Sequence, residues 1–299
     1  MRSPLFPRHC VTVVGVLNVT PDSFSDGGRF ATHDRADIEG AVAEALRMQR
    51  AGANVIDVGG ESTRPGSEEV PAAIELARVV PVVEALAKTC EVPLSIDTRK
   101  SVVARAALAA GASIVNDVSG GRFDPALLGA VAESGAWIVL GHARGTPATM
   151  QRDPHFEDVL MEVAEELAAR VAAAEAAGVA ADRIIVDPGI GFGKRQQDNL
   201  ALLANIGWLG ERLDKPVLVG PSRKAFLGAL TGDPVDARDV ATAAACAVAV
   251  FAGANAIRVH DVGAGVRAAR IGESLRAATV RAKVDAIEAP WFVRGKAPS

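Results

Sequence analysis

The chain has 299 residues, of which 49% are hydrophobic and 23% charged, and this ordinary globular composition excludes a disordered chain. Its 32 Lys and Arg against 36 Asp and Glu give a net charge of -4. With 4% aromatic residues and no basic block, the chain is not expected to bind nucleic acid. Three widely spaced cysteines, Cys10, Cys90 and Cys246, indicate neither a disulfide framework nor a zinc site.

No segment is typical of export or of a membrane span. Residues 1–10 contain two prolines and lack the apolar centre of a signal peptide. The most apolar stretch, 241–256, is rich in Ala and is interrupted by Thr242, Gly253 and Asn255, so a buried helix is the better interpretation. Together with the unpaired cysteines, this predicts a cytoplasmic protein with no membrane partner.

One pattern recurs along the chain: an Ala-rich helical segment ends at a Gly, a short β-branched run follows, and a polar residue closes that run. A Gly just past a helix is the usual left-handed stop, and short apolar runs are typical of strands buried on both faces. The expected strands are 11–19, 54–57, 93–98, 113–117, 137–142, 183–188, 216–222 and 256–261. The expected helices are 36–51, 71–88, 101–110, 125–133, 156–177, 199–206, 236–252 and 265–284.

Eight alternations of strand and helix predict an α/β fold, a single (β/α)8 TIM barrel that forms one domain over residues 1–299. The barrel core spans about residues 10–284, between a short N-terminus and a loosely held tail at 290–299. An open doubly wound sheet is the alternative architecture. No linker rich in Gly, Ser or Pro divides the chain.

Polar residues close almost every expected strand, at the end where such barrels carry their functional groups. A single Asp in this place is commonly a helix cap or loop anchor, and we keep that interpretation for Asp117 and Asp261. The convergence of the other polar residues on one rim indicates a functional site. They are Asn18, Asp57, Asp97, Asn116, His142, Asp187, Lys224, Arg258 and His260.

Three glycine-containing loops add to this rim. The loop NVTPDSFSDGG at 18–28 has a length that suits a lid. The loop GGESTRPG at 59–66 offers backbone amides, hydroxyls and an Arg to an anion, although Gly-rich loops are common. The pairs Gly27-Gly28 and Gly59-Gly60 are expected to give these two loops backbone freedom. The loop DPGIGFGK at 187–194 is not a P-loop and suits a flat ligand.

Two shorter motifs are rich in donors. GPSRK at 220–224 ends a strand and opens a helix, so Ser222 is expected as the N-cap of a helix whose N-terminus suits a carboxylate or phosphate. In RVH at 258–260, alternation along the strand turns Arg258 and His260 to the same side, where two basic groups make a second anion site. A buried core histidine is the alternative for His260.

These motifs resemble those of dihydropteroate synthase, a family of folate biosynthesis, in the family's order and over about residues 10–284. They are GVLNVTPDSFSDGG (15–28), DVGGESTRPG (57–66), SIDT (95–98), NDVSG (116–120), DPGIGFGK (187–194), SRK (222–224) and RVHDV (258–262). The resemblance implies a homodimeric transferase that condenses 6-hydroxymethyl-7,8-dihydropterin pyrophosphate with para-aminobenzoate. It implies 7,8-dihydropteroate and pyrophosphate as products, a requirement for Mg²⁺, and an SN1-like course through a pterin cation.

The resemblance also assigns residues to each part of the site. The pterin would be bound by Asp97, Asn116, Asp187, Gly191, Phe192 and Lys224. Pyrophosphate would be bound by Asn18, Thr63, Arg64, Arg258 and His260, with Asn18 also binding Mg²⁺. Para-aminobenzoate would be bordered by Phe24, Thr63, Pro65 and Ser222. The catalytic residues would be Asp97, Lys224, Arg258 and His260. The chemistry agrees, because an aminopyrimidine edge needs acceptors such as Asp, and its oxo group needs donors.

The sequence departs from the family at two positions. Gly141 stands where many relatives carry Met, which removes one pterin-lining side chain, and Pro221 removes a backbone donor inside the GPSRK motif. Two other functions share part of the pattern. A folate-binding corrinoid methyltransferase has no use for the motifs at 18–28, 222–224 and 258–260. A non-enzymatic pterin-binding paralogue does not explain why every expected polar position is filled.

Overall fold

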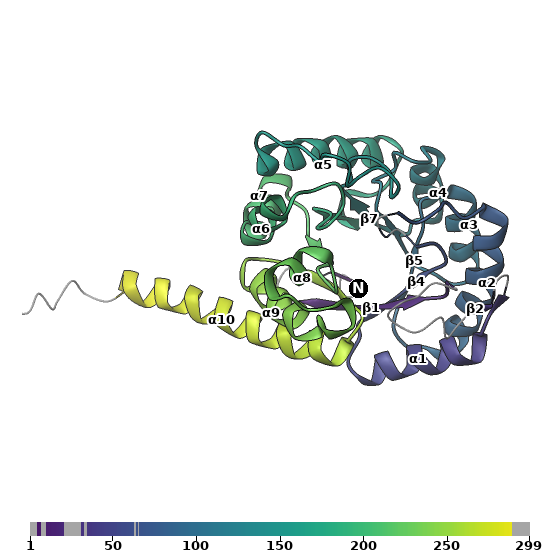
Figure 1. Cartoon of the computed structure of the whole chain (residues 1–299), viewed down its shortest axis with the longest axis horizontal. Helices are drawn as coiled ribbons and strands as arrows, with labels where there is room; N and C mark the ends of the chain where they lie inside the picture. The colour runs from purple at the N-terminus through teal and green to yellow at the C-terminus, as the bar shows by residue number, and fades with distance from the viewer. Residues whose placement is uncertain are drawn as a thin grey trace, which may run out of the picture.

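The computed structural model describes residues 5–6, 10–20, 31–32, 35–62, 64 and 66–288, and it confirms the (β/α)8 barrel (Figure 1). Eight parallel strands lie in the order β8-β7-β6-β5-β4-β1-β10-β9. In chain order they are β1 Thr12–Asn18, β4 Val55–Gly59, β5 Leu94–Asp97, β6 Ile114–Asp117, β7 Trp137–Gly141, β8 Ile184–Asp187, β9 Leu218–Val219 and β10 Ala256–Val259. A short hairpin, β2 Ala31–Thr32 and β3 Arg35–Ala36, precedes the first helix.

The two outer strands of this order meet at a narrow seam. Val186 of β8 forms a parallel bridge with Val217, and the Val186 N–H donates to the Pro216 carbonyl at 3.0 Å. This contact joins the sheet into a ring, so the open doubly wound alternative is wrong.

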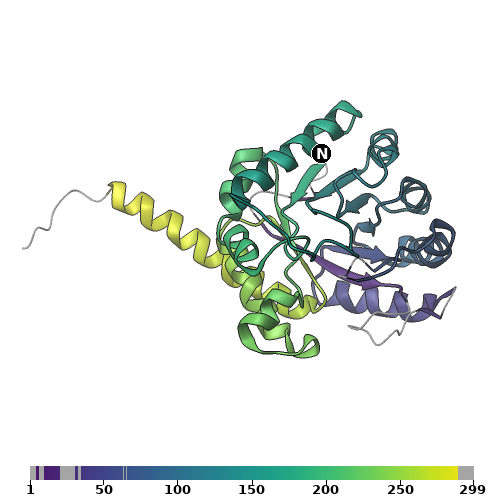
Figure 2. The same ribbon diagram turned by 45° about the horizontal axis from the view of Figure 1, so that its top comes forward.

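Helices lie around the outside of the ring (Figures 1 and 2). They are α1 Ile38–Arg50, α2 Ala72–Thr89, α3 Ser101–Ala109, α4 Ala126–Ser134, α5 Val159–Ala176, α6 Gln196–Ala204, α7 Ile206–Leu213, α8 Ala225–Thr231, α9 Asp239–Phe251 and α10 Val262–Glu288. Single 3-10 turns lie at Ala181–Arg183 and Val235–Ala237. The far half of α10 extends away from the barrel (Figure 2). Within the ranges given above, no helix is long and apolar enough to span a membrane.

Each expected strand is present, and the differences lie at a few boundaries. Strand β9 covers two residues rather than 216–222, because Pro221 lacks the N–H that a continuing ladder needs. The helix expected at 199–206 is two helices, α6 and α7, and α10 is longer than 265–284 at both ends. The helix that the GPSRK motif was expected to open is α8, which was given no bounds from the sequence because its seven residues are too few to show a helical period. The tail at 290–299 lies outside the described residues.

The helix boundaries follow the local signals. The four glycines expected to end helices, Gly52, Gly111, Gly135 and Gly253, all have positive φ, between 66° and 118°. At the opposite ends, the Asp158 carboxylate accepts from the N–H groups of Leu160 and Met161 and so caps α5.

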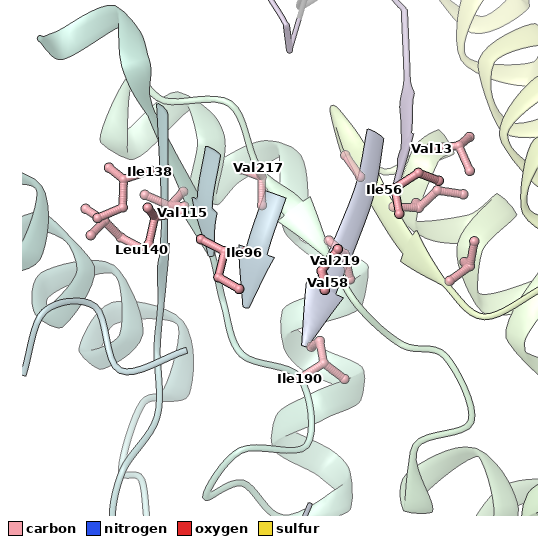
Figure 3. Close-up of a cluster of buried hydrophobic side chains, with 14 of the residues drawn as sticks. Val13, Ile56, Val58, Ile96, Val115, Ile138, Leu140, Ile190, Val217 and Val219 are labelled. Carbon is pink, nitrogen blue, oxygen red and sulfur yellow. The ribbon is translucent and has the colours of Figure 1, made fainter. Parts of the chain in front are cut away.

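Alternation along the strands divides the core into two layers. One set of side chains points outward and packs against the helices, and it includes Val13, Ile56, Val58, Ile96, Val115, Ile138 and Leu140 (Figure 3). The other set points inward and forms the floor of the barrel: Val14, Val55, Ile114, Val139, Ile185, Leu218 and Ala256, with Phe6 beneath them. The residues two positions further along these strands therefore face the interior above an apolar floor.

One glycine shows how closely neighbouring strand ends approach. Gly189, just beyond β8, has φ +67°, and a Cβ there would overlap the carbonyl oxygen of His142, just beyond β7. Gly232, after α8, has φ +80° but no atom within 4 Å of the same position. The two sites share a left-handed backbone and differ in the space around it.

We expect Gly189→Ala to lower the free energy of unfolding by more than about 3 kcal/mol, because the backbone of two strand ends must separate. The matched variant Gly232→Ala should cost about 1–2 kcal/mol, the strain of a left-handed residue alone. Urea unfolding followed by circular dichroism measures both. Equal losses for the two variants would contradict the close approach described here.

Candidate active site

Several of the polar side chains expected at the rim point into the barrel, as the apolar side chains of its floor do. Asp57 follows Val55, Asn116 follows Ile114, and Arg258 follows Ala256, each two residues further along the same strand. Asp117 has the opposite parity and serves as a loop anchor, accepting from the N–H groups of Ser119 and Gly121. The period of two therefore separates the site residues from the anchors.

Arg258 lies at the centre of the site. Its Nε donates to Asp57 Oδ2 at 2.6 Å and its Nη2 donates to Asp97 Oδ2 at 2.7 Å. The Asn116 Nδ2 donates to the same Asp57 oxygen at 3.0 Å. Two predicted residues, Arg258 and Asn116, thus meet at Asp57, a residue that we counted on the rim but did not assign to any ligand. Its membership of the DVGG motif and its parity were the signals that could have assigned it.

Burial governs the protonation of Asp97. Burial raises the pKa of Asp97 to about 7, against the lowering effect of Arg258, and the nearby carboxylate of Asp57 adds to the rise. Asp57 is fully buried, and its Oδ1 has no hydrogen-bond partner within the described part of the chain. The site therefore holds more acceptor capacity than Arg258 and Asn116 use.

A second group of residues joins the loop after β8 to the start of α8. Burial raises the pKa of Asp187, although the Gly189 N–H donates to its Oδ1 at 2.7 Å and Lys224 lies nearby. The Lys224 Nζ lies 3.7 Å from the centroid of the Phe192 ring, and burial lowers its pKa to about 8. A Cβ on Gly191 would lie 3.0 Å from the Lys224 Cδ, so the glycine leaves room for this lysine.

Ser222 and His260 form a pair of their own. The Ser222 Oγ lies 2.8 Å from His260 Nδ1, and the His260 N–H donates to the same oxygen at 3.3 Å. The expected N-cap role of Ser222 is wrong, since α8 starts three residues later and Lys224 occupies its N-cap position. Burial, and then the charge of Arg258, hold the pKa of His260 well below its usual range. His260 is therefore neutral at pH 7, and the positive charge of the RVH motif belongs to Arg258.

The base of the loop at 59–66 is closely packed. A Cβ on Gly60 would lie 2.5 Å from Val79 Cγ1, so this glycine is required by close packing against α2. The buried Glu61 accepts from Arg99 Nη2 at 3.0 Å and from Lys100 Nζ at 2.7 Å. At Gly60 and Glu61 these contacts oppose the backbone freedom expected from Gly59-Gly60.

Of the remaining predicted residues, the structure describes Asn18 and Arg64. A Cβ on Gly59 would lie 3.6 Å from both Asn18 Oδ1 and Asp97 Cβ, which places the Asn18 amide beside the central carboxylates. Arg64 is half-buried, and its charge is one of the influences that lower the pKa of Lys224 after burial and Arg258. Three further predicted residues and one glycine pair lie outside the described residues: Phe24, Thr63, Pro65, and Gly27-Gly28.

The metal-ligating side chains present limit which metal ion the site could bind. Across the residues that the structure describes, no group of three or more His, Cys, Asp or Glu side chains is placed to hold a metal ion. Mg²⁺, however, is commonly bound by one or two protein oxygens together with substrate phosphates and water. A single amide oxygen at Asn18 fits that mode and does not fit an all-protein metal cage.

The two departures from the family have structural consequences. At Gly141 a Cβ would lie 2.6 Å from Val118 Cα, so the backbone of the loop after β6 fills the space that a side chain would need. Pro221 is buried and its carbonyl accepts from the Lys224 N–H at 3.2 Å, which keeps the turn before α8 closed. Neither position disturbs the charged groups of the site.

Comparisons with known proteins identify the family of this chain. A family model described as pterin binding enzyme matches residues 14–260. A dihydropteroate synthase of Synechocystis sp. is 44% identical over 264 residues, which are 88% of this chain and 89% of that protein. The solved dihydropteroate synthase of Yersinia pestis with a sulfonamide drug is 41% identical, with a TM-score of 0.85 over 91% of this chain and 96% of that one. The enzyme of Xanthomonas albilineans in complex with 7,8-dihydropteroate is 42% identical, with a TM-score of 0.78 over 91% and 95% of the two chains. The chain therefore belongs to the pterin binding enzymes and, within them, to the dihydropteroate synthase family.

Proposed function

We propose that this chain condenses 6-hydroxymethyl-7,8-dihydropterin pyrophosphate with para-aminobenzoate, giving 7,8-dihydropteroate and pyrophosphate. The observation that carries the proposal is the inward-facing set of carboxylate acceptors and cationic donors at one barrel mouth, centred on the contacts of Arg258 with Asp57 and Asp97. Family membership supports the same reaction.

Pterin recognition follows from the complementary edges of ligand and site. The amino group and protonated ring nitrogen of the pterin need acceptors, which Asp97 and Asp187 supply when ionised. The ring oxo group needs donors, which Lys224 and the Asn116 amide supply. The Phe192 ring, already beside the Lys224 ammonium, offers an apolar surface to the flat ligand.

Cleavage would occur at the bond between the pterin methylene carbon and the pyrophosphate oxygen, with the electron pair leaving on oxygen. Arg258 and Arg64 would stabilise the negative charge that develops there. Asn18 would hold Mg²⁺, which when bound neutralises charge on the phosphate oxygens. The cationic methylene that remains would be favoured by the neighbouring Asp97 carboxylate.

The second substrate then completes the reaction. The arylamine lone pair attacks the methylene carbon, and the nitrogen loses a proton to give the neutral product. An arylamine is unprotonated at pH 7, so no strong general base is required, and the neutral His260 fits that expectation. Ser222 would border the aminobenzoate, together with Phe24, Thr63 and Pro65, which lie outside the described residues.

The assembly and location of the chain are also proposals: a homodimer in the cytoplasm. Large apolar side chains are exposed along one face of α9 and α10, namely Val240, Val248, Phe251, Ile271 and Leu275. Val240, Val248 and Phe251 recur at helical spacing, as do Ile271 and Leu275. Such a stripe is the kind of surface that a subunit interface buries.

The reaction is tested directly with both substrates. We expect the purified chain to release pyrophosphate only when the pterin pyrophosphate and para-aminobenzoate are both present with Mg²⁺, and to lose that activity with EDTA. Arg258→Met, which keeps the length of the side chain but leaves Asp57 and Asp97 without their cation, should lower kcat/KM by at least about 100-fold. Release without the arylamine, or full activity in EDTA, would contradict the proposal.

The pH dependence of pterin binding follows from the two perturbed groups. Below about pH 7 Asp97 becomes protonated and loses acceptor strength, and above about pH 8 Lys224 loses its charge, so affinity should be greatest between these values. Calorimetric titration with a non-reactive pterin measures the profile. Asp97→Asn should flatten the acid limb and Lys224→Met the alkaline limb. An alkaline limb that persists in Lys224→Met would belong to the pterin, and a flat profile in the unaltered chain would be inconsistent with both assignments.

Para-aminobenzoate should bind appreciably only after Mg²⁺ and pyrophosphate are in place. Asn18 and Arg64 are close in sequence to the residues expected to border the arylamine, so bound Mg²⁺ and pyrophosphate would add contacts beside that ligand. The arylamine alone is a small ligand with few contacts of its own. Equilibrium binding of the labelled compound is compared with no addition, with either component and with both. Asn18→Ala should remove the effect of Mg²⁺, and tight binding without additions would show a preformed pocket.

A further inference from the structure

Lys194, the last residue of the DPGIGFGK loop, is a buried lysine that the proposed reaction does not use. It is 3% exposed, and it forms no ion pair with a carboxylate among the residues that the structure describes. Its Nζ lies 2.8 Å from His142 Nδ1, 3.1 Å from the Phe192 carbonyl oxygen and 3.4 Å from the His142 carbonyl oxygen. Burying an amine is costly, so three polar contacts at one nitrogen indicate a defined role.

The partner His142 is fixed from its other side. His142 has outward parity and faces α5, where its Nε2 lies 3.0 Å from Glu166 Oε2. Arg144 Nε donates to the other Glu166 oxygen at 2.9 Å and so holds this carboxylate. Burial, and then the charge of Lys194, lower the pKa of His142 to about 4, so the ring is neutral at pH 7. With its proton on Nε2 toward Glu166, the ring presents Nδ1 as an acceptor to Lys194.

Lys194 therefore joins two strand ends that already touch. Gly189 lies against the His142 carbonyl, and a Cβ on Gly193 would overlap the carbonyl oxygen of Arg144. The loop after β8 is thus pressed onto the segment after β7, and the Lys194 side chain donates into the gap between the two backbones. Burial lowers the pKa of Lys194 to about 7, against the attraction of Asp187.

The contact with Phe192 leads from this buried lysine to the pterin site. The carbonyl that Lys194 binds belongs to the residue whose ring lies beneath the Lys224 ammonium at 3.7 Å. The Phe192 N–H donates to the Gly189 carbonyl at 3.0 Å, so both polar backbone atoms of Phe192 are bonded. The direction of the ring is set by a backbone that has little freedom.

We infer that Lys194 is a positioning residue of the pterin pocket, which fixes the Phe192 backbone and thereby the Phe192 ring and the Lys224 ammonium above it. The inference rests on the proposed pterin function. It assigns to Lys194 no contact with substrate. It predicts an effect on the pterin substrate alone, since the hydrogen bonds of Lys194 within the described part of the chain go to His142 and Phe192 and not to Ser222.

The test compares Lys194→Met with Lys215→Met. Both lysines are largely buried and donate to a backbone carbonyl, but Lys215 binds Glu175 and Ala181 on the outside of the barrel. Losing the hydrogen bonds of the buried Lys194 amine should raise the KM for the pterin pyrophosphate about tenfold or more in Lys194→Met. The KM for para-aminobenzoate and kcat at saturation should change less than about twofold, and Lys215→Met should leave all three constants unchanged.

A double-mutant cycle with Phe192→Leu shows whether Lys194 acts through the ring. If it does, Lys194→Met should add less than about twofold to the pterin KM once the ring is gone. Fully multiplicative effects, or equal losses for both substrates, would overturn the inference. Lys194→Arg, which keeps the hydrogen-bond donors, provides the comparison if Lys194→Met does not fold. A tenfold rise in KM for both substrates in Lys194→Arg would also contradict the inference. Calorimetric pterin binding separates this outcome from failure of the proposed reaction, because binding requires no turnover.

Discussion

The guanidinium of Arg258 is the interaction on which the mouth of the barrel depends. It comes from β10 and bonds carboxylates on β4 and β5, so one side chain links three strands across the interior. The two carboxylates would repel each other without it, and the cation would be buried without compensation if both were removed. Asn116 shares Asp57 with Arg258 and thereby adds β6 to the same unit. The polar interior is therefore a single network, in which the charge of Arg258 opposes the effect of burial on the pKa of Asp97.

Much of this arrangement could be predicted from the sequence because it follows from the order of the elements. The alternation of helix and strand predicted the barrel, and the place of Asn18, Asp97, Asn116 and Arg258 at or near the ends of strands predicted that they share one rim. What the sequence could not provide is the pairing across strands. Nothing in the order of residues says that Arg258 reaches Asp57, 201 positions away, or that Ser222 turns to His260 instead of capping α8.

Two interpretations drawn from glycines share one limit, which is that a glycine has more than one use. Gly59-Gly60 suggested a loop with backbone freedom, and Gly60 also allows α2 to pass close to it. Gly141 suggested a missing pocket-lining side chain, and the same glycine also allows the backbone of Val118 to approach. A single sequence cannot distinguish a glycine that allows motion from one that allows contact, because the difference lies in residues distant along the chain. His142 illustrates a related limit: it ends a strand beside the site residues, but its parity turns it toward α5.

The barrel is joined by fewer backbone contacts between β8 and β9 than between its other neighbouring strands. Seven of the strand-to-strand junctions are continuous ladders, whereas this one is a lone bridge at Val186 and Val217. Asp187 stands at one side of the seam and Lys224 follows the strand on its other side, and both belong to the pterin pocket. A pterin bound to both residues would therefore connect β8 and β9, the two neighbouring strands with the least pairing. The contacts that recognise the substrate would then also help to hold the barrel closed.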